Sequence, residues 1–243
     1  MTILWIILAN LVIGALIGLT GVAGFLLPML YVSLGYGVQE ALALSFFAFF
    51  LSGTLGSYNY HRSRQLNLAN GMRLGIPSLF GAILGVWLNT RIAEGTVQIL
   101  LYLVVLLSGI SILLRKDRDR GTSTFPTLPV TILLGFASAV ICALSGAGGP
   151  VLVMPLLVVL GVSVREAIAL ALFDSIFIAI PSGIGYLLAC DARALLPILA
   201  LSGLAHAIGV YVASCYSNMV PQGIIKRTVA ICSILLALYK LFF

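Results

Sequence analysis

The sequence predicts an all-α polytopic membrane protein built from two homologous, inverted repeats, each interrupted by a glycine-broken or re-entrant helix. Hydrophobic residues make up 61% of the chain and charged residues only 8%, whereas a soluble domain carries roughly 25% charged residues. Apolar spans recur along the sequence at about 20 residues, the length that a helix needs to cross a hydrocarbon core of about 30 Å. The same series of spans is also written twice.

The repeat is clearest at two glycine-rich breaks. Thr20-Gly-Val-Ala-Gly24 leads into one apolar run that contains a proline, and Ser145-Gly-Ala-Gly-Gly149 leads into another. The phrase that follows each break is repeated as well, as Gly35–Leu44 and Gly161–Leu170. We therefore expect a single transmembrane domain over residues 1–243, with repeat 1 at about 1–114, a polar linker at 115–129 and repeat 2 at about 130–243.

Each repeat contains five apolar segments. In order, they are Ile3–Leu19, Phe25–Leu34, Ala41–Tyr58, Met72–Asn89 and Val97–Leu114, then Val130–Leu144, Val151–Leu160, Ala167–Cys190, Ala194–Tyr216 and Thr228–Phe243. The segments after the breaks have about 10 to 14 residues, a length typical of re-entrant or broken helices. No Lys or Arg precedes Arg62, so we expect the first span to be retained as a membrane helix rather than removed as a signal peptide.

Charged residues lie mainly in short loops, where they report orientation. Three arginines in the His61–Arg73 loop and four basic residues in the linker predict that both face the cytoplasm. In the second repeat the bias moves to the opposite loop, which holds Lys226 and Arg227. This exchange is expected of inverted repeats with an odd number of crossings each, three if the segments around a break form a re-entrant hairpin and five if they cross. The net charge of +6 therefore does not indicate nucleic-acid binding.

Four cysteines are spaced singly, at Cys142, Cys190, Cys215 and Cys232. No spacing of cysteine or histidine indicates a zinc site or a disulfide framework. We expect structural cysteines, no metal and no organic cofactor. The expected partners are a small anionic substrate and the lipid bilayer, and the oligomeric state is left open.

The two breaks are the candidate substrate site. A broken helix is costly in lipid unless protein or water covers the freed backbone groups. Where glycines expose successive N–H groups and a half-helix begins, an anion can be held without a charged side chain. The alternative is that these glycines only allow close helix packing. The predicted binding residues are Thr20, Gly21, Gly24, Ser145, Gly146, Gly148 and Gly149.

Several further motifs accompany the breaks: Ala41-Leu-Ala-Leu-Ser45, Ser52-Gly53, Tyr60-His-Arg62 and a helix rich in small residues at Gly75, Gly81-Ala82 and Gly85. Together they resemble the TauE/SafE sulfite exporter (TSUP) family of membrane permeases over essentially the whole chain. The resemblance implies a non-enzymatic transporter of a small anion, such as sulfite, thiosulfate or sulfoacetate, and adds Ser45 to the substrate site. It also implies a multi-pass protein of the cell membrane, which is the inner membrane in a Gram-negative source.

Two titratable residues stand alone within apolar spans. Asp174 has Ala48 at the equivalent position of repeat 1, and His206 has Ala82. An ionisable residue inside a membrane segment is costly and by default functional, commonly in a proton or cation relay. We therefore predict that Asp174 and His206 couple transport to an ion. The alternatives are a protonated Asp and a structural His that each hydrogen-bond a neighbouring helix.

Two other functions remain open. An uncoupled anion channel has the same sequence features as a carrier. Ala143–Ala147 and Ala205–Gly209 also resemble the serine and histidine dyad of rhomboid intramembrane proteases, in which a histidine activates a serine at a helix start. A protease does not need the repeat, and the first copy keeps Thr20 but has Ala82 in place of the histidine. The transporter is therefore favoured.

Overall fold

The computed structural model describes residues 2–21, 23–93 and 125–216, with individual residues between 95 and 110 and between 231 and 238. The predicted spans Val97–Leu114 and Thr228–Phe243 lie mostly outside the described residues. So do linker residues 115–124, the basic pair Lys226 and Arg227, and Cys232.

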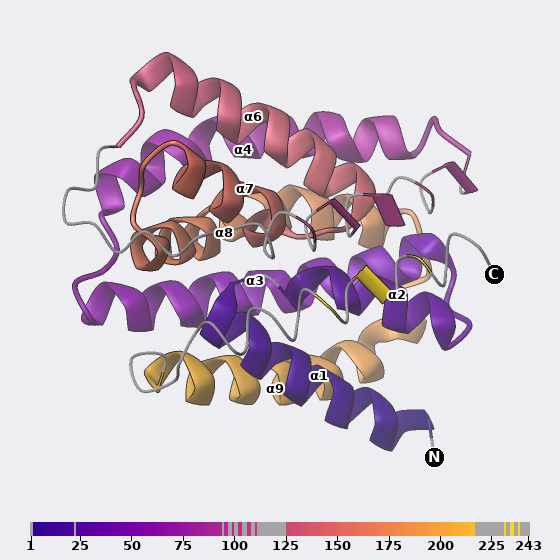
Figure 1. The fold of residues 1–243 in the computed structure, drawn as a ribbon. Helices are drawn as coiled ribbons and strands as arrows, with labels where there is room; N and C mark the ends of the chain where they lie inside the picture. The colour runs from indigo at the N-terminus through magenta and orange to yellow at the C-terminus, as the bar shows by residue number, and fades with distance from the viewer. Residues whose placement is uncertain are drawn as a thin grey trace.

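Every regular element in the described part of the chain is a helix (Figure 1). Repeat 1 contains α1 (Thr2–Thr20), the short 3₁₀ helix η1 (Ala23–Phe25), α2 (Leu26–Ser33), α3 (Val38–Arg62) and α4 (Leu68–Asn89). Repeat 2 contains α6 (Leu128–Ser145), α7 (Gly149–Val159), α8 (Val164–Leu188) and α9 (Ala192–Cys215). Six of these helices, namely α1, α3, α4, α6, α8 and α9, are long and apolar enough to cross a membrane. The predicted all-α polytopic membrane fold is confirmed.

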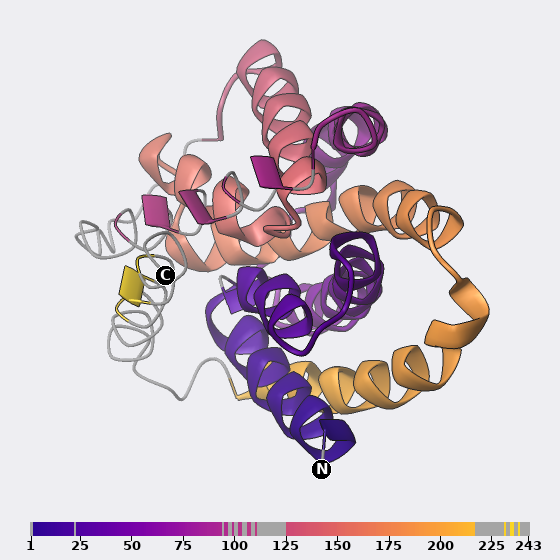
Figure 2. The same cartoon turned by 90° about the vertical axis from the view of Figure 1, so that its right-hand side faces the viewer.

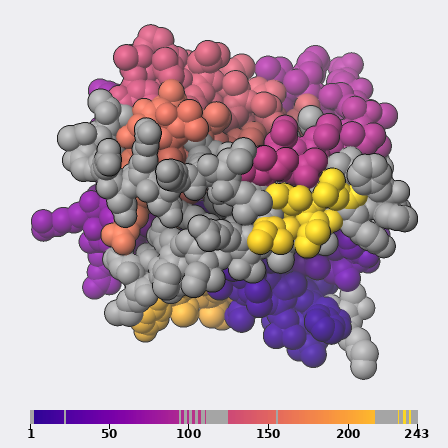
Figure 3. Space-filling model, in the orientation of Figure 1, coloured from indigo at the N-terminus to yellow at the C-terminus, as the bar shows by residue number. Residues whose placement is uncertain are grey.

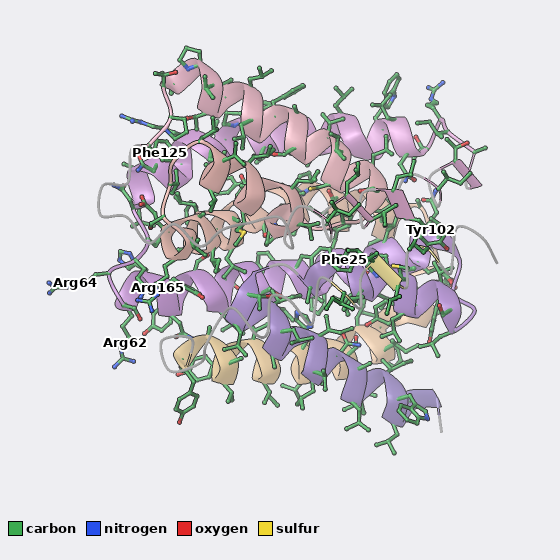
Figure 4. The ribbon with its side chains drawn as sticks, in the orientation of Figure 1. Phe25, Arg62, Arg64, Tyr102, Phe125 and Arg165 are labelled. Atoms are coloured by element: carbon green, nitrogen blue, oxygen red, sulfur yellow. The ribbon has the colours of Figure 1, made fainter. Side chains whose placement is uncertain are left out.

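The helix that follows each break turns back along the helix before it. Asn10 of α1 donates to the hydroxyl of Tyr31 of α2 at 2.9 Å, and these residues stand about equally far from the first break. In the second repeat, Phe125 before α6 and Arg165 after α7 lie at the same end of the molecule (Figure 4). The helices on either side of each break therefore form a hairpin, an arrangement that agrees with the re-entrant alternative.

The long helices α3 and α8 form the centre of the molecule and run antiparallel. Gly56, late in α3, faces Leu172, whereas Gly183, late in α8, faces Phe46. Seen along the helices, α1 and α9 lie on one side of this pair and α4 and α6 on the other (Figure 2). The most deeply buried side chains gather here, including Phe46, Leu44, Tyr60, Leu172 and Tyr186.

The outer helices pair across the repeats, because α1 packs on α9 and α6 packs on α4. Glycines make the contact in both pairs. A Cβ added at Gly14 would lie 2.5 Å from the carbonyl oxygen of His206, and one at Gly85 would lie 2.5 Å from that of Val140. Close backbone approach at small residues is how membrane helices associate without a hydrophobic driving force. The inversion of the repeats stays a prediction. The antiparallel arrangement of α3 and α8 agrees with it, and so does the packing of each outer helix on a helix of the other repeat.

Large apolar side chains cover the outside of the bundle. Phe80, Leu133, Leu188 and Leu204 each expose at least 60% of their surface. In Figure 3, α6 and α4 lie along one edge of the molecule and α1 and α9 along the other. A surface of this kind is expected against lipid and not against water. The described surface therefore agrees with the membrane location that the composition predicts.

Candidate functional site

The two breaks begin in the same way. Helices α1 and α6 end at Gly21 and Gly146, with φ of 68° and 72°, and each glycine amide bonds the carbonyl four residues earlier. Gly148 then opens α7 with φ of 77°. Side chains rarely adopt this left-handed region, which explains why glycine stands at these positions.

Breaking a helix leaves its last carbonyls without intrahelical partners, and buried tyrosines cover them in both repeats. Tyr186 of α8 donates to the carbonyl of Ala143 at 2.7 Å. Its counterpart Tyr60 of α3 donates to Gly18 at 3.4 Å. The carbonyl of Leu144 also accepts from the Asn89 side chain of α4 at 2.8 Å. These contacts let the protein tolerate two interrupted helices in an apolar interior.

Replacing Tyr186 with phenylalanine is expected to destabilise the protein by about 1–3 kcal/mol, because it leaves the carbonyl of Ala143 buried without this partner. The thermal midpoint of the purified protein should fall by roughly 2–4 °C for each kcal/mol. Tyr60→Phe should cost less, because its hydrogen bond is longer. Equal thermal midpoints for Tyr186→Phe and the wild-type protein would show that the hydroxyl does not support the break.

Both breaks pack against the central pair, with contacts that repeat between the two halves. A Cβ at Gly21 would lie 3.1 Å from Ile168 of α8, and one at Gly146 would meet the equivalent residue of α3, Leu42. The first break lies beside Phe49 of α3 and the second beside its counterpart, Ser175 of α8. The breaks therefore both pack against the first half of α3 and of α8.

The ring of Phe49 lies between the two breaks. A Cβ on Gly24 would be 2.9 Å from ring atom Cε1, and a Cβ on Gly148 would be 3.2 Å from Cε2 and Cζ. Glycines of both repeats therefore contact the same ring. The position of Ser45 follows from helical spacing, since Leu42, Ser45 and Phe49 share one face of α3. This places Ser45 on the face that meets the breaks.

The predicted hydroxyl groups point back to their own helices. Thr20 donates to Leu16 at 2.7 Å, Ser145 to Ile141 at 2.7 Å and Ser45 to Ala41 at 2.6 Å. In this conformation these hydrogens are not offered to a ligand. The ligand donors that remain at the start of α7 are chiefly the backbone N–H groups of Gly148 and Gly149, because Pro150 has no N–H and the N–H of Val151 bonds the carbonyl of Gly148 at 3.3 Å.

Asp174 lies beside the second break. Its side chain is fully buried, and neither carboxylate oxygen has a hydrogen-bond partner of normal geometry among the described residues. The hydroxyl of Ser78 of α4, which donates to Leu74 at 2.9 Å, lies within hydrogen-bonding reach of the carboxylate, and Cys142 of α6 lies within electrostatic range of it. The thiol of Cys142 contacts the carbonyl oxygen of Gly148 at 3.2 Å, which links the surroundings of the acid to the break.

His206 lies in a different part of the interior. Its Nε2 atom is 2.6 Å from the hydroxyl of Ser52 on α3, and its backbone packs against Gly14 of α1. Its Nδ1 atom has no hydrogen-bond partner among the described residues. The hydroxyl of Ser145 bonds Ile141 instead, so the Ser145–His206 dyad that the protease alternative requires is not formed.

The chain matches the family "Sulfite exporter TauE/SafE" over residues 6–240. The protein belongs to this family. It is also similar to the probable membrane transporter protein YdhB of Bacillus subtilis (strain 168), with 25% identity over 245 residues that cover 98% of this chain and 99% of that protein. No solved structure matches the chain. Membership of the TauE/SafE family confirms the resemblance seen in the sequence and identifies a multi-pass membrane transporter of the cell membrane.

Three features of this TauE/SafE protein were missed from the sequence. Phe49 and Ser175 occupy equivalent positions at the breaks, and Ser52 is the partner of His206. When the sequences of α3 and α8 are aligned, the aromatic Phe49 corresponds to Ser175. This difference between the repeats was the sequence signal for both residues. Ser52 offered none, because its partner lies 154 residues away.

Proposed function

We propose that this protein carries a small sulfur oxyanion or organosulfonate across the membrane and binds it where the two breaks meet. The observation that carries the proposal is the convergence of both breaks on one ring, Phe49. An anion there would accept hydrogen bonds from the N–H groups that open α7, helped by the positive end of that helix dipole. The binding site would consist of the predicted residues Thr20, Gly21, Gly24, Ser45, Ser145, Gly146, Gly148 and Gly149.

A site made of backbone donors suits a carrier. It can desolvate and hold an anion without a fixed cation, so release does not require an ion pair to be broken in an apolar medium. Such sites at discontinuous helices near the midplane occur in transporters built from inverted repeats. In the described conformation the Phe49 ring closes the junction, so we infer that the ring moves when the anion enters.

Asp174 would supply the coupling. Burying a carboxylate without partners costs several kcal/mol, and binding a proton removes most of that cost. An anion that travels alone works with or against about 2.3 kcal/mol per charge per 100 mV. A proton held at Asp174, beside the second break, would offset that term and link anion movement to the pH gradient. His206 is the second candidate for this role.

The proposal is tested with purified protein in liposomes, using sulfite, thiosulfate, sulfoacetate, taurine and sulfate as substrates. We expect at least one sulfur anion to accumulate against its concentration gradient when a pH gradient is imposed. Movement only down the anion gradient would favour an uncoupled anion channel. Cleavage of a membrane-anchored peptide, lost in Ser145→Ala, would favour the protease instead.

A further inference from the structure

A second feature of the molecule lies away from the breaks. A cavity of about 830 Å³ opens at the end where α3 turns into α4 and where α8 begins. Its lining includes His61, Arg64, Asn67, Ala69, Arg165 and Glu166. We call it the vestibule. Arg62, Arg64 and Arg165 all lie at this end of the molecule, and Arg64 extends outward from it (Figure 4).

The vestibule is electropositive. Its lining carries two guanidinium groups, those of Arg64 and Arg165, and one carboxylate, that of Glu166. The first turns of α4 and α8 also form part of its wall, and helix N-termini add partial positive charge. A surface hollow with an excess of positive charge raises the local concentration of anions. The vestibule therefore favours anions.

The backbone at Arg64 is an independent sign that this side chain matters. Arg64 has a φ of 56° and is the only residue other than glycine with a positive φ in the described part of the chain. It ends α3 in a Schellman motif, in which the amide of Gln65 bonds the carbonyl of Tyr60 at 2.9 Å. Glycine is the usual residue at such a position. Arginine adopts this backbone conformation at a cost that glycine would avoid, and its side chain lines the vestibule. The cost indicates that the side chain has a role there.

The repeat provides an internal comparison. The phrase after each break keeps its glutamate, Glu40 or Glu166, but Arg165 in the second copy corresponds to Gln39 in the first. The start of α8 therefore carries a positive charge beside its glutamate that the equivalent start of α3, at the other end of the molecule, lacks. Packing requirements shared by the two copies do not explain this difference.

We propose that the vestibule is an entry site that concentrates the transported oxyanion before it reaches the breaks. This inference rests on the proposed function. Arg165 precedes Ser175, the α8 residue beside the second break, by ten residues, or about 15 Å of helix at 1.5 Å per residue. An anion bound at the vestibule would therefore lie about half the thickness of the hydrocarbon core from the break junction, measured along α8.

The test uses two substitutions that the fold accepts. Arg64→Gly supplies the residue that the backbone conformation prefers, and Arg165→Gln supplies the residue that repeat 1 has at this place. In liposomes of phosphatidylcholine alone, the double variant is expected to raise the KM for the transported anion about threefold to tenfold with Vmax unchanged. Its KM should also lose most of its dependence on ionic strength. Arg62→Gln removes a nearby charge outside the vestibule lining and should leave KM unchanged.

Three results would overturn the vestibule proposal while leaving the proposed function intact. The first is an unchanged KM in the double variant, and the second is an equal rise of KM in Arg62→Gln, which would reflect bulk surface charge. The third is an effect seen only when phosphatidylglycerol is present, which would assign the arginines to lipid headgroups. If the wild-type protein transports none of the sulfur anions, the proposed function fails instead.

A second measurement does not depend on transport. Ala69, in the vestibule wall, is replaced by cysteine in a background without the four native cysteines. It is then labelled with an anionic or a cationic methanethiosulfonate reagent. We expect the anionic reagent to react faster, inorganic sulfate to slow it, and Arg64→Gly with Arg165→Gln to reverse the preference. Equal rates for both reagents in the wild-type background would refute an anion-concentrating vestibule.

Discussion

Gly148→Ala is expected to reduce oxyanion transport by about tenfold or more, equivalent to at least about 1.4 kcal/mol of lost binding or activation free energy. The new methyl group would lie 3.2 Å from the Phe49 ring, in the space between the two breaks. It would also sit beside the first N–H groups of α7, to which we assign the anion. Initial uptake rates and anion-induced thermal shifts of the purified variant measure the loss, and Gly148→Leu should abolish both.

The control for this prediction is Gly35→Ala. Gly35 also has a positive φ, of 90°, so alanine there meets a backbone penalty as well, but no atom lies within 4 Å of the added Cβ. Loss of transport in Gly148→Ala with near-normal transport in Gly35→Ala would show that a positive-φ substitution alone does not abolish transport. If Gly148→Ala folds and binds sulfur anions with native affinity, the site lies elsewhere in the molecule.

The sequence predicted the helices and the breaks because both depend on local chemistry. Apolar length alone identifies a membrane helix, and the left-handed conformation at Gly21, Gly146 and Gly148 is one that glycine adopts without penalty. The duplication added what a single copy could not. It indicated that the two breaks are equivalent and therefore meet near a common axis, as the contacts with Leu42 and Ile168 now support.

Tertiary contacts limited the rest of the prediction. The sequence of α6 does not reveal that Gly135 packs against α4, where an added Cβ would lie 2.5 Å from the carbonyl oxygen of Leu74. Likewise, His206 was linked to Ser145 because short motifs suggested it, whereas α9 packs on α1 and α3 and presents the histidine to Ser52. Which helices become neighbours is decided by packing between segments far apart in the chain.

Asp174→Asn is expected to remove the dependence of transport on a pH gradient while leaving anion binding largely intact. Asparagine preserves the size of the side chain and most of its hydrogen-bonding capacity, but it stays neutral at every pH. Because the carboxylate is fully buried and its oxygens have no hydrogen-bond partner of normal geometry among the described residues, we propose that the wild-type side chain gains and loses a proton during a transport cycle. Uptake driven by an imposed pH gradient should fall to the level seen without a gradient, whereas anion-induced thermal shifts should persist.

Ser182→Ala is the matched control, because Ser182 is a buried polar residue of the same helix whose hydroxyl has no partner in the described part of the structure. It removes a polar group from α8 but no titratable proton, so pH-driven uptake should remain. Unchanged pH-driven transport in Asp174→Asn would make Asp174 a structural residue. His206 would then be the remaining candidate for proton coupling. Its replacement by glutamine tests whether the proton is carried by His206, between α9 and Ser52 of α3. If Asp174→Asn and the His206 variant both respond normally to the pH gradient, neither residue carries a coupling proton. The uncoupled anion channel is then favoured over the carrier.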